Sequence, residues 1–244
     1  MKIIGIIPAR YGSSRFPGKP LKILCGKSVI QRTYEQASKA LDEVWVATDH
    51  PEIEAHVKEF QGKVIVTRAD HPSGTDRIFE AAQKLTNQPD YIVNIQGDEP
   101  MINPEQIKEL VQVLDGKTEI ATQYKANTDS SELDNPNIVK LVSNLNHEAL
   151  YFSRFGIPYK RNPELPFKGF KQHIGIYAYR IDVLEKITQL PVSSLEEAES
   201  LEQLRWLENG YKIKLVETRH QTIGIDTPED LERAIKELEK NSGT

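Results

Sequence analysis

Several features are scarce or absent in this 244-residue chain, and each absence narrows its function. The single cysteine, Cys25, cannot form an internal disulfide, which fits a reducing compartment and predicts a cytoplasmic protein. The sequence has no apolar run of the length needed for a membrane span. Its short apolar block near the first residue is also too short for a signal peptide. The formal net charge of -5 argues against general nucleic-acid binding.

The composition that is present is typical of a folded globular protein. Hydrophobic residues make up 38% of the chain and charged residues 27%, which excludes disordered and fibrous classes. The charge is unevenly distributed, because residues 1–40 hold eight basic side chains and one acidic side chain. That segment therefore carries +7, and the remaining 204 residues carry -12. A basic segment is often only a solvated face, so its sequence context decides how it should be interpreted.

Short apolar segments alternate with helical patterns through residue 125. A β-branched run without polar interruptions is typical of a strand buried on both faces of a parallel sheet. Strand and helix alternation with short connections predicts right-handed βαβ units. The fold class is therefore α/β, a nucleotide-binding core with a mostly parallel sheet flanked by helices. The expected strands are 3–7, 44–47, 63–67, 91–95 and 120–124, and the expected helices are 28–41, 75–85, 104–114 and one that Pro51 opens.

The alternation breaks after about residue 125, which predicts a smaller mixed lobe in the second half. Segments 138–145 and 172–179 have the pattern of antiparallel strands. No low-complexity linker and no internal repeat separates the two halves. We therefore expect a single domain with a core at about 1–125, a substrate and dimer lobe at about 126–215, and a return to the core at 216–244. The lobe and the return hold further expected helices at 184–190, 195–207 and 228–238, and a strand at 212–217.

The loop after the first expected strand reads PARYGSSRFPGKP. Ligands of open parallel sheets bind beyond the carboxyl ends of the strands. Glycine and serine at residues 12–14 allow a tight turn that presents backbone N–H groups to an anion. Arg10, Arg15 and Lys19 add positive charge and hydrogen-bond donors for several phosphates. The loop matches neither GxGxxG nor GxxxxGK[ST], so a triphosphate loop of another type is predicted.

Two aspartates follow expected strands at positions that suit metal binding. Asp98 lies in QGDEP after the strand 91–95, and Asp226 lies in GIDTPED before the last helix. Two carboxylates facing a triphosphate would hold Mg²⁺, which prefers oxygen ligands and keeps several waters. A structural alternative stays open for each, since Asp98 could be a turn residue and Asp226 a helix cap. Asp49 and Asp76 lie at a strand end and a helix start, and we interpret both as structural.

Other polar residues give weaker signals. The six histidines show no metal-ligand spacing, so a zinc site is not expected. Cys25 lies among apolar residues and is interpreted as a small buried side chain, not a nucleophile. Tyr177 lies in an apolar pattern that is typical of a core position.

Taken together, the motifs resemble those of the 3-deoxy-manno-octulosonate (Kdo) cytidylyltransferase family over nearly the whole chain. The N-terminal loop recurs in related nucleotidyltransferases, whereas the later motifs are more specific. The resemblance rests on IPARYGSSRFPGKPL (7–21), VATDH (46–50), SGTDR (73–77), IVNIQGDEPMI (92–102), NPNIVKLV (135–142), ALYFSRFGIPY (149–159), HIGIYAYR (173–180), LEQLRWLENG (201–210) and DTPEDLER (226–233).

The resemblance implies an activity and a set of site residues. The activity is the reaction of CTP with Kdo to give CMP-Kdo and diphosphate in lipopolysaccharide biosynthesis, with Mg²⁺, in a cytoplasmic homodimer whose second-half lobe forms the interface. Arg15, Lys19, Asp98 and Asp226 would be catalytic, and the two aspartates would bind the metal. The nucleotide would contact Ala9, Arg10, Arg15, Lys19, Ser73, Arg77 and Asp98. The sugar acid would contact Gln96, Arg154, His173, Tyr177, Glu202 and Gln203.

Departures from the family pattern are small, and several alternatives stay open. Phe155 and Gly156 replace the residues that family members often carry, and the stretch 160–171 is short and basic. A relative that activates 8-amino-Kdo, or one that acts on another sugar acid such as sialic acid, would share many motifs. A glycosyltransferase normally has an Asp-x-Asp pair, whereas this chain has Asp98-Glu99-Pro100. A non-catalytic nucleotide sensor would not need both aspartates and the basic loop.

Overall fold

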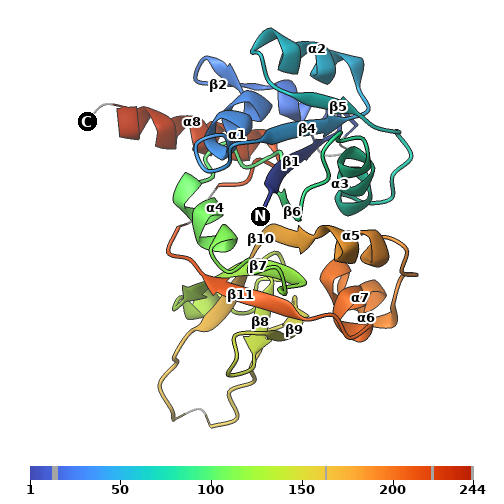
Figure 1. The fold of residues 1–244 in the computed structure, drawn as a ribbon. Helices are drawn as coiled ribbons and strands as arrows, with labels where there is room; N and C mark the ends of the chain where they lie inside the picture. The colour runs from blue at the N-terminus through green and yellow to red at the C-terminus, as the bar shows by residue number, and fades with distance from the viewer. Residues whose placement is uncertain (13–15, 163, 221–222, 243–244) are drawn as a thin grey trace. The chain divides into compact units, whose positions relative to one another are not determined.

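The computed structural model describes residues 1–12, 16–162, 164–220 and 223–242, and the chain divides into two compact units (Figure 1). Unit 1 comprises Met1–Lys108 and Gln221–Thr244, and unit 2 comprises Glu109–His220. Each unit is described by itself below. The expectation of a single domain with boundaries near residues 125 and 215 stays a prediction.

Unit 1 is built on four parallel strands in the order β6-β1-β4-β5. Their register pairs Ile6 of β1 with Trp45 of β4 on one side and with Asn94 of β6 on the other. The middle of β1 is buried because strands or helices cover it on every side. The strands are β1 (Ile3–Ala9), β4 (Val44–Thr48), β5 (Val64–Val66) and β6 (Tyr91–Asn94).

Helices connect these strands and pack around them (Figure 1). They are α1 (Val29–Ala37), α2 (Pro51–Glu59), α3 (Gly74–Gln83) and α4 (Pro104–Val111), the last of which contains the boundary of unit 1. The Ser28 hydroxyl caps α1 by accepting a hydrogen bond from the Gln31 N–H at 3.1 Å. Pro51 stands at the first turn of α2, where its fixed φ favours the helix. The α/β fold class is therefore confirmed for this part of the chain.

The last helix of the chain packs on a small hairpin in unit 1. The hairpin pairs β2 (Ile23–Leu24) with β3 (Lys27–Ser28), just after the 3₁₀ helix η1 (Lys19–Leu21). Leu24, Val29, Ile225 and Ala234 are buried together in one apolar cluster. This packing brings the start of α8 (Pro228–Ser242) beside the segment that contains Lys19.

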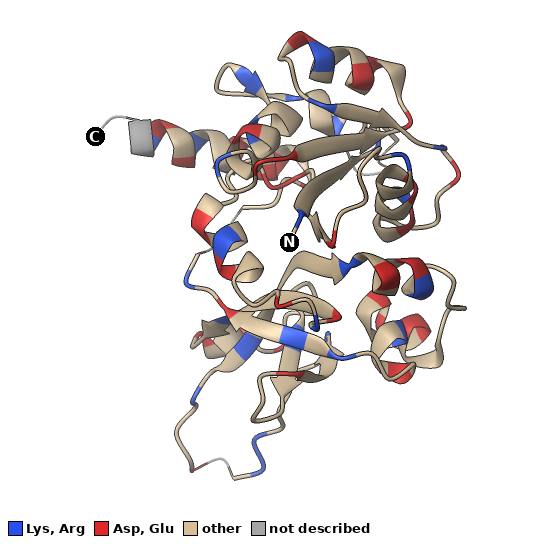
Figure 2. Ribbon diagram, viewed as in Figure 1, with Lys and Arg blue, Asp and Glu red and all other residues tan. Residues whose placement is uncertain are grey.

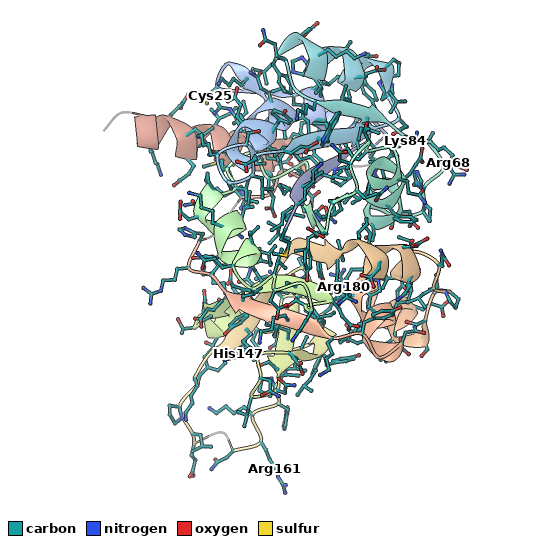
Figure 3. The ribbon with its side chains drawn as sticks, in the orientation of Figure 1. Cys25, Arg68, Lys84, His147, Arg161 and Arg180 are labelled. Carbon is teal, nitrogen blue, oxygen red and sulfur yellow. The ribbon has the colours of Figure 1, made fainter. Side chains whose placement is uncertain are left out.

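The turn of this hairpin corrects one expectation. Cys25 is exposed, not buried, and its φ of 47° belongs to the left-handed region. The residue occupies the two-residue turn between β2 and β3, whereas the preceding Leu24 is buried in the apolar cluster. Figure 3 shows Cys25 at the outer edge of the hairpin. An apolar sequence neighbourhood did not predict burial because tight hairpin turns are surface features.

Unit 2 contains a mixed sheet of five strands among its described residues. β7 (Ile120–Asn127) pairs antiparallel with β10 (Phe170–Arg180) and parallel with β11 (Ile213–Glu217). β8 (Lys140–Ser143) pairs antiparallel with β10 and with β9 (Ala149–Ser153). The predicted antiparallel strands near 138–145 and 172–179 are confirmed, whereas β9 was not predicted from the sequence. The helices are η2 (Ser130–Glu132), α5 (Ile181–Ile187), α6 (Ser194–Glu199) and α7 (Glu202–Glu208).

The helix expected over 195–207 is interrupted. Ser200, at the carboxyl end of α6, has a φ of 52° and a ψ of 50°, and Leu201 is extended. The left-handed residue ends α6 and lets α7 start in a new direction. The apolar periodicity did not reveal this break, because leucines at residues 195, 201, 204 and 207 continue a helix-like pattern across it.

Charged side chains of both signs are interleaved along the outer faces of α2 and α8 (Figure 2). Such mixing is typical of solvated helix faces. Among the described residues, no helix is both long and apolar enough to cross a membrane.

Candidate active site

A cleft of about 410 Å³ opens in unit 1 beyond the carboxyl ends of its parallel strands. This is the edge at which open α/β sheets bind ligands. Its walls come from the loops after β1, β5 and β6 and from the segment before α8. The lining residues are Pro8, Ala9, Arg10, Lys19, Pro20, His71, Pro72, Ser73, Gly74, Arg77, Gln96, Gly97, Asp98 and Asp226.

Lys19 joins the two aspartates that the sequence singled out. Its Nζ donates to Asp98 Oδ2 at 2.7 Å and to Asp226 Oδ1 at 3.1 Å. The lysine side chain is 14% exposed, so the two ion pairs are partly shielded from water. The Ile225 N–H also donates to the Asp98 carbonyl oxygen at 2.8 Å, which ties the two segments together by their backbones. A basic loop and a carboxylate pair therefore meet at one point.

The start of α8 shows why Asp226 is available for this role. Thr227 caps the helix, with its hydroxyl accepting from the Asp230 N–H at 3.3 Å. The Asp230 carboxylate accepts in return from the backbone N–H groups of Asp226 and Thr227, each at 3.0 Å. Burial opposes the ionisation of Asp230, but these hydrogen bonds outweigh it and lower the pKa of Asp230. The cap is thus made by Thr227 and Asp230, and the Asp226 carboxylate points to Lys19.

The donor set of this carboxylate pair fits Mg²⁺. Both groups supply only oxygen, and both contact the same ammonium, so one cation can be shared between them. Among the residues that the structure describes, no group of three or more histidine, cysteine or acidic side chains is arranged as a metal cage. A site of two carboxylates suits Mg²⁺, which commonly takes its remaining ligands from substrate phosphates and water.

Two glycines lie against Pro8 on the floor of the cleft, and one of them cannot be replaced without a clash. A Cβ on Gly97 would lie 2.7 Å from the carbonyl oxygen of Pro8, which is closer than a real Cβ approaches backbone. A Cβ on Gly74 would lie 3.7 Å from the Pro8 ring, in ordinary contact. Ala9, at the end of β1, is 3% exposed and completes this floor. The loops after β5 and β6 therefore both approach Pro8, and the second can do so only with glycine.

Ser73 and Arg77 lie on the wall formed by α3. Ser73 caps this helix, with its hydroxyl accepting from the Asp76 N–H at 3.2 Å and donating to Asp76 Oδ2 at 2.7 Å. Arg77 is 5% exposed, and its Nη1 lies 2.8 Å from Asp49 Oδ1 and 2.7 Å from Thr67 Oγ1. Asp49 and Asp76 therefore position neighbouring side chains, as their structural interpretation predicted.

Three further residues that the sequence analysis assigned to the site remain to be placed: Arg10, Gln96 and Arg15. Arg10 lines the cleft and is exposed. Gln96, which the resemblance assigns to the sugar acid, lines this same cleft in unit 1. Arg15 lies outside the described residues, so its role stays a prediction. No sequence signal singled out His71 as a binding residue, although the structure places it in the cleft wall.

Unit 2 gathers predicted sugar-acid residues in an aromatic cluster. The His173 ring packs edge-on against Phe152 at 5.0 Å and tilted against Tyr177 at 5.4 Å, and Trp206 packs edge-on against Tyr177 at 5.3 Å. His173 Nε2 lies 3.1 Å from Thr122 Oγ1. Burial lowers the pKa of His173 to about 3, so the ring is neutral at physiological pH.

Tyr177 and Gln203 are the deeper members of this group, each 6% exposed. Burial, and then the nearby Tyr179 and Glu202, raise the pKa of Tyr177 well above its ordinary value, so its hydroxyl keeps its proton. The amide Nε2 of Gln203 is buried and has no hydrogen-bond partner among the described residues. A buried donor of this kind is typical of a site that pairs with a ligand.

Arg154 lies at the end of β9 and makes an extensive set of contacts to carbonyl groups. Its Nε donates to the Glu199 carbonyl at 2.7 Å, its Nη1 to that of Pro136 at 2.9 Å, and its Nη2 to that of Ser200 at 3.3 Å. Three of the five guanidinium N–H groups are therefore engaged, and the other two have no hydrogen-bond partner among the residues that the structure describes. Binding of a substrate carboxylate by Arg154 stays a prediction.

An α/β fold with a basic loop after its first strand, beside two carboxylates and a cleft, fits the nucleotidyltransferase class. The comparisons are more specific. The chain belongs to the cytidylyltransferase family, whose model matches residues 4–213. The predicted family resemblance is thereby confirmed.

Relatives with assigned names are similar over almost the whole chain. A 3-deoxy-manno-octulosonate cytidylyltransferase of Parabacteroides distasonis is 57% identical and covers 96% of this chain and 97% of its own length. The enzyme of the same name from Bacteroides thetaiotaomicron is 54% identical, with 99% and 100% covered. A solved CMP:2-keto-3-deoxy-manno-octonic acid synthetase complexed with CTP is 46% identical, with a TM-score of 0.93 over 99% of this chain and 100% of that one.

Proposed function

We propose that the protein transfers the cytidylyl group of CTP to Kdo, giving CMP-Kdo and diphosphate. The observation that carries this proposal is the meeting of Lys19, Asp98 and Asp226 in the cleft of unit 1. Family membership supports it, as do the names of relatives that match nearly full length. Those names include a complex with CTP, which favours cytosine as the base of the nucleotide.

Different residues of the cleft are proposed to bind different parts of the nucleotide. Arg10 and Lys19 supply positive charge to the triphosphate, and Arg15 is proposed to do the same. Ala9, at the end of β1, has a small side chain and lines the same cleft as Gly74 and Gly97, which leaves room for the nucleoside there. Ser73 and Arg77 shape the α3 wall. Each of these groups orients CTP before reaction and lowers the cost of positioning it.

The reaction is a substitution at the α-phosphorus. The anomeric hydroxyl oxygen of Kdo forms a bond to phosphorus, the bond to the bridging oxygen breaks, and the hydroxyl proton leaves to solvent while diphosphate departs. Arg10, Arg15 and Lys19 would stabilise the negative charge of the leaving group. Asp98 and Asp226 would hold Mg²⁺, which when bound supplies charge neutralisation at the phosphates.

The polar side chains of unit 2 are proposed to contact the sugar acid, and the sugar-acid role that the resemblance implies for Gln96, in unit 1, stays a separate prediction. The neutral ring of His173, the protonated hydroxyl of Tyr177 and the buried amide of Gln203 suit the hydroxyl groups of a sugar. Glu202 and Arg154 complete the proposed set, with Arg154 suited to the carboxylate. The 8-amino analogue of Kdo, or another sugar acid such as sialic acid, is the alternative substrate.

A homodimer is also proposed, with unit 2 contributing the interface. Six large apolar side chains among the described residues of this unit are exposed: Leu145, Leu150, Phe155, Tyr159, Leu165 and Val192. Exposed apolar residues in this number favour a protein interface. Light scattering after size-exclusion chromatography would test the dimer. The use of CTP supports a cytoplasmic location.

Diphosphate release tests the activity. The assay contains CTP, Mg²⁺ and one of three sugar acids: Kdo, 8-amino-Kdo or sialic acid. We expect release with Kdo and less with the other two. Release with only 8-amino-Kdo or only sialic acid would make that sugar acid the substrate in place of Kdo. No release with any of the three would refute the proposed function.

A further inference from the structure

The strands β7 and β10 of unit 2 lie side by side (Figure 1), but their pairing is irregular at one point. Gln123 of β7 pairs with Ile174 of β10. Its neighbour Thr122 pairs with Tyr177, three residues further along β10. The two residues between Ile174 and Tyr177 are therefore additional to β7, and β10 forms a bulge there. Bulges of this kind re-aim side chains and are frequent beside functional sites.

The bulge brings together two of the residues predicted for the sugar acid. His173 lies opposite Tyr124 and Tyr177 lies opposite Thr122, and these partners are only two residues apart on β7. Four residues of regular strand span about 13 Å, whereas two residues span about 7 Å. The ring centroids of His173 and Tyr177 lie 5.4 Å apart. The two side chains are therefore neighbours because of the bulge.

Thr122 is fully buried at this bulge, and its hydroxyl contacts the bulged backbone. The hydroxyl donates to the Ile176 carbonyl oxygen at 2.7 Å and lies 3.2 Å from the Ile174 carbonyl oxygen. A hydroxyl group has one proton, and a carbonyl oxygen can only accept it. With its proton directed at these carbonyl groups, the hydroxyl oxygen of Thr122 can only accept from any further partner.

That further partner is His173, whose Nε2 lies 3.1 Å from Thr122 Oγ1. Because the threonine oxygen accepts, the imidazole must donate, which places a proton on Nε2. Burial lowers the pKa of His173 to about 3, so the ring carries only this one proton at neutral pH. Nδ1 is then an acceptor, and it has no hydrogen-bond partner among the residues that the structure describes.

We propose that Thr122 is a positioning residue for the sugar acid, and that it acts by fixing His173 as the tautomer whose Nδ1 accepts a hydrogen bond from a sugar hydroxyl group. This inference rests on the proposed function, which makes Kdo the substrate. In the other tautomer the lone pair of Nε2 would face the oxygen of Thr122, and Nδ1 would be a donor. The buried contact with Thr122 would then be lost, which disfavours that tautomer.

The position of the proton can be observed directly. Nuclear magnetic resonance of protein that contains ¹⁵N-labelled histidine distinguishes protonated from unprotonated ring nitrogens, and His173→Gln identifies the signals of His173. We expect wild-type His173 to carry its proton on Nε2 at neutral pH. Thr122→Val, which replaces the hydroxyl by a methyl group, should populate both tautomers. A wild-type ring that is protonated on Nδ1, or on both nitrogens, would overturn the proposal.

Steady-state kinetics test the consequence for the substrate. Thr122→Val should raise the KM for Kdo by about tenfold, as for one lost hydrogen bond, while the KM for CTP stays near that of wild type. Thr122→Ser keeps the hydroxyl and should resemble wild type. Thr188→Val is the matched control, since it removes a hydroxyl of unit 2 that donates to the Leu184 carbonyl at 3.1 Å. Equal increases of both KM values in Thr122→Val, or an equal defect in Thr122→Ser, would overturn the proposal.

A double-mutant cycle shows whether Thr122 acts through His173. In the His173→Gln background, Thr122→Val should raise the KM for Kdo much less than it does in wild type, because the side chain that it positions is gone. The same increase in both backgrounds would overturn the proposal. Circular dichroism monitors folding, and Thr122→Ala replaces Thr122→Val if that variant does not fold.

Failure of this inference and failure of the proposed function give different results. If wild type turns over Kdo and Thr122→Val keeps the wild-type KM for Kdo, the role of Thr122 is wrong while the proposed function stands. If wild type releases no diphosphate with any sugar acid, the proposed function fails. The proton on His173 is still observed without turnover, and a proton on Nδ1 would then overturn the inference by itself.

Discussion

Asp98 and Asp226 both contact the ammonium group of Lys19, although more than a hundred residues of sequence separate the two aspartates. We expect removal of one carboxylate to leave the fold of unit 1 intact, since the side chains of Asp98 and Asp226 are 31% and 49% exposed. We expect Asp98→Asn to lose most of its Mg²⁺-dependent diphosphate release, because a neutral amide is a poor ligand for Mg²⁺. Asp182→Asn, which removes a carboxylate paired with Arg180 in unit 2, is the matched control. A folded and fully active Asp98→Asn enzyme would refute the metal assignment.

The contact of Lys19 with Asp98 and Asp226 also predicts that the melting temperature will depend on Mg²⁺ once Lys19 is replaced. Lys19→Met removes the cation that keeps two carboxylates together, so their repulsion should lower the melting temperature of the metal-free protein. Mg²⁺ should restore part of this loss, because it binds the folded state selectively. Differential scanning fluorimetry with EDTA and with Mg²⁺ measures both effects. An equal Mg²⁺-induced rise in wild type and Lys19→Met would contradict the idea of a shared site.

Gly97 is the tightest point of the cleft floor. Gly97→Ala brings a Cβ against the Pro8 carbonyl, and backbone on both sides must move to relieve a 2.7 Å contact. We expect a loss of about 1–3 kcal/mol in the free energy of unfolding, as for overpacking, and a marked fall in kcat. Gly224→Ala is the control, since a Cβ there meets nothing within 4 Å. Urea denaturation and steady-state kinetics measure the two quantities, and a wild-type value for both in Gly97→Ala would refute the close approach.

Sequence patterns predicted the Lys19, Asp98 and Asp226 site because parallel strands deliver their following loops to one edge of a sheet. They did not predict the contact of His71 with Glu80, which needs the depth and angle of α3 against its preceding loop. The left-handed Ser200 was missed because no glycine marks the break. For this chain, the sequence predicted the ends of the strands well. It did not predict which polar side chains contact each other beyond those ends.

Lys140 is a fully buried lysine of β8 that no sequence pattern singled out. Burial lowers its pKa, yet its Nζ donates to the Asn135 carbonyl at 3.0 Å and to the Arg154 carbonyl. Lys140→Met leaves these acceptors unpaired, and we expect it to cost about 1–3 kcal/mol in the free energy of unfolding. Because Arg154 would shift, the KM for Kdo should rise while the KM for CTP stays near that of wild type.

Lys140→Arg provides the conservative comparison, since a guanidinium can still donate to carbonyl groups. It should recover part of the affinity for Kdo. Equal increases of both KM values in Lys140→Met would indicate general loss of structure, and would contradict a specific effect through Arg154.

The lowered pKa of His173 makes the stability of the protein depend on pH. Its pKa is about 3 when folded, against the ordinary value of 6.5, because burial disfavours the charged form. Between these values the unfolded chain binds the extra proton, so the free energy of unfolding rises with pH, by at most about 1.4 kcal/mol per unit for this group. Acidification from pH 6.5 to 5 should therefore destabilise wild type.

His173→Gln removes the ionisable ring and should flatten this part of the curve. The window of pH 5 to 6.5 is chosen because Glu80, whose pKa is about 2 when folded, contributes in the same direction only at lower pH. His147→Asn is the control, since His147 is exposed and its positive φ suits asparagine. Urea denaturation at each pH gives the curves. If the free energy of unfolding changes with pH equally in wild type and His173→Gln, the idea that the fold keeps His173 neutral is wrong. The pKa of His173 would then be the same in the folded and unfolded states.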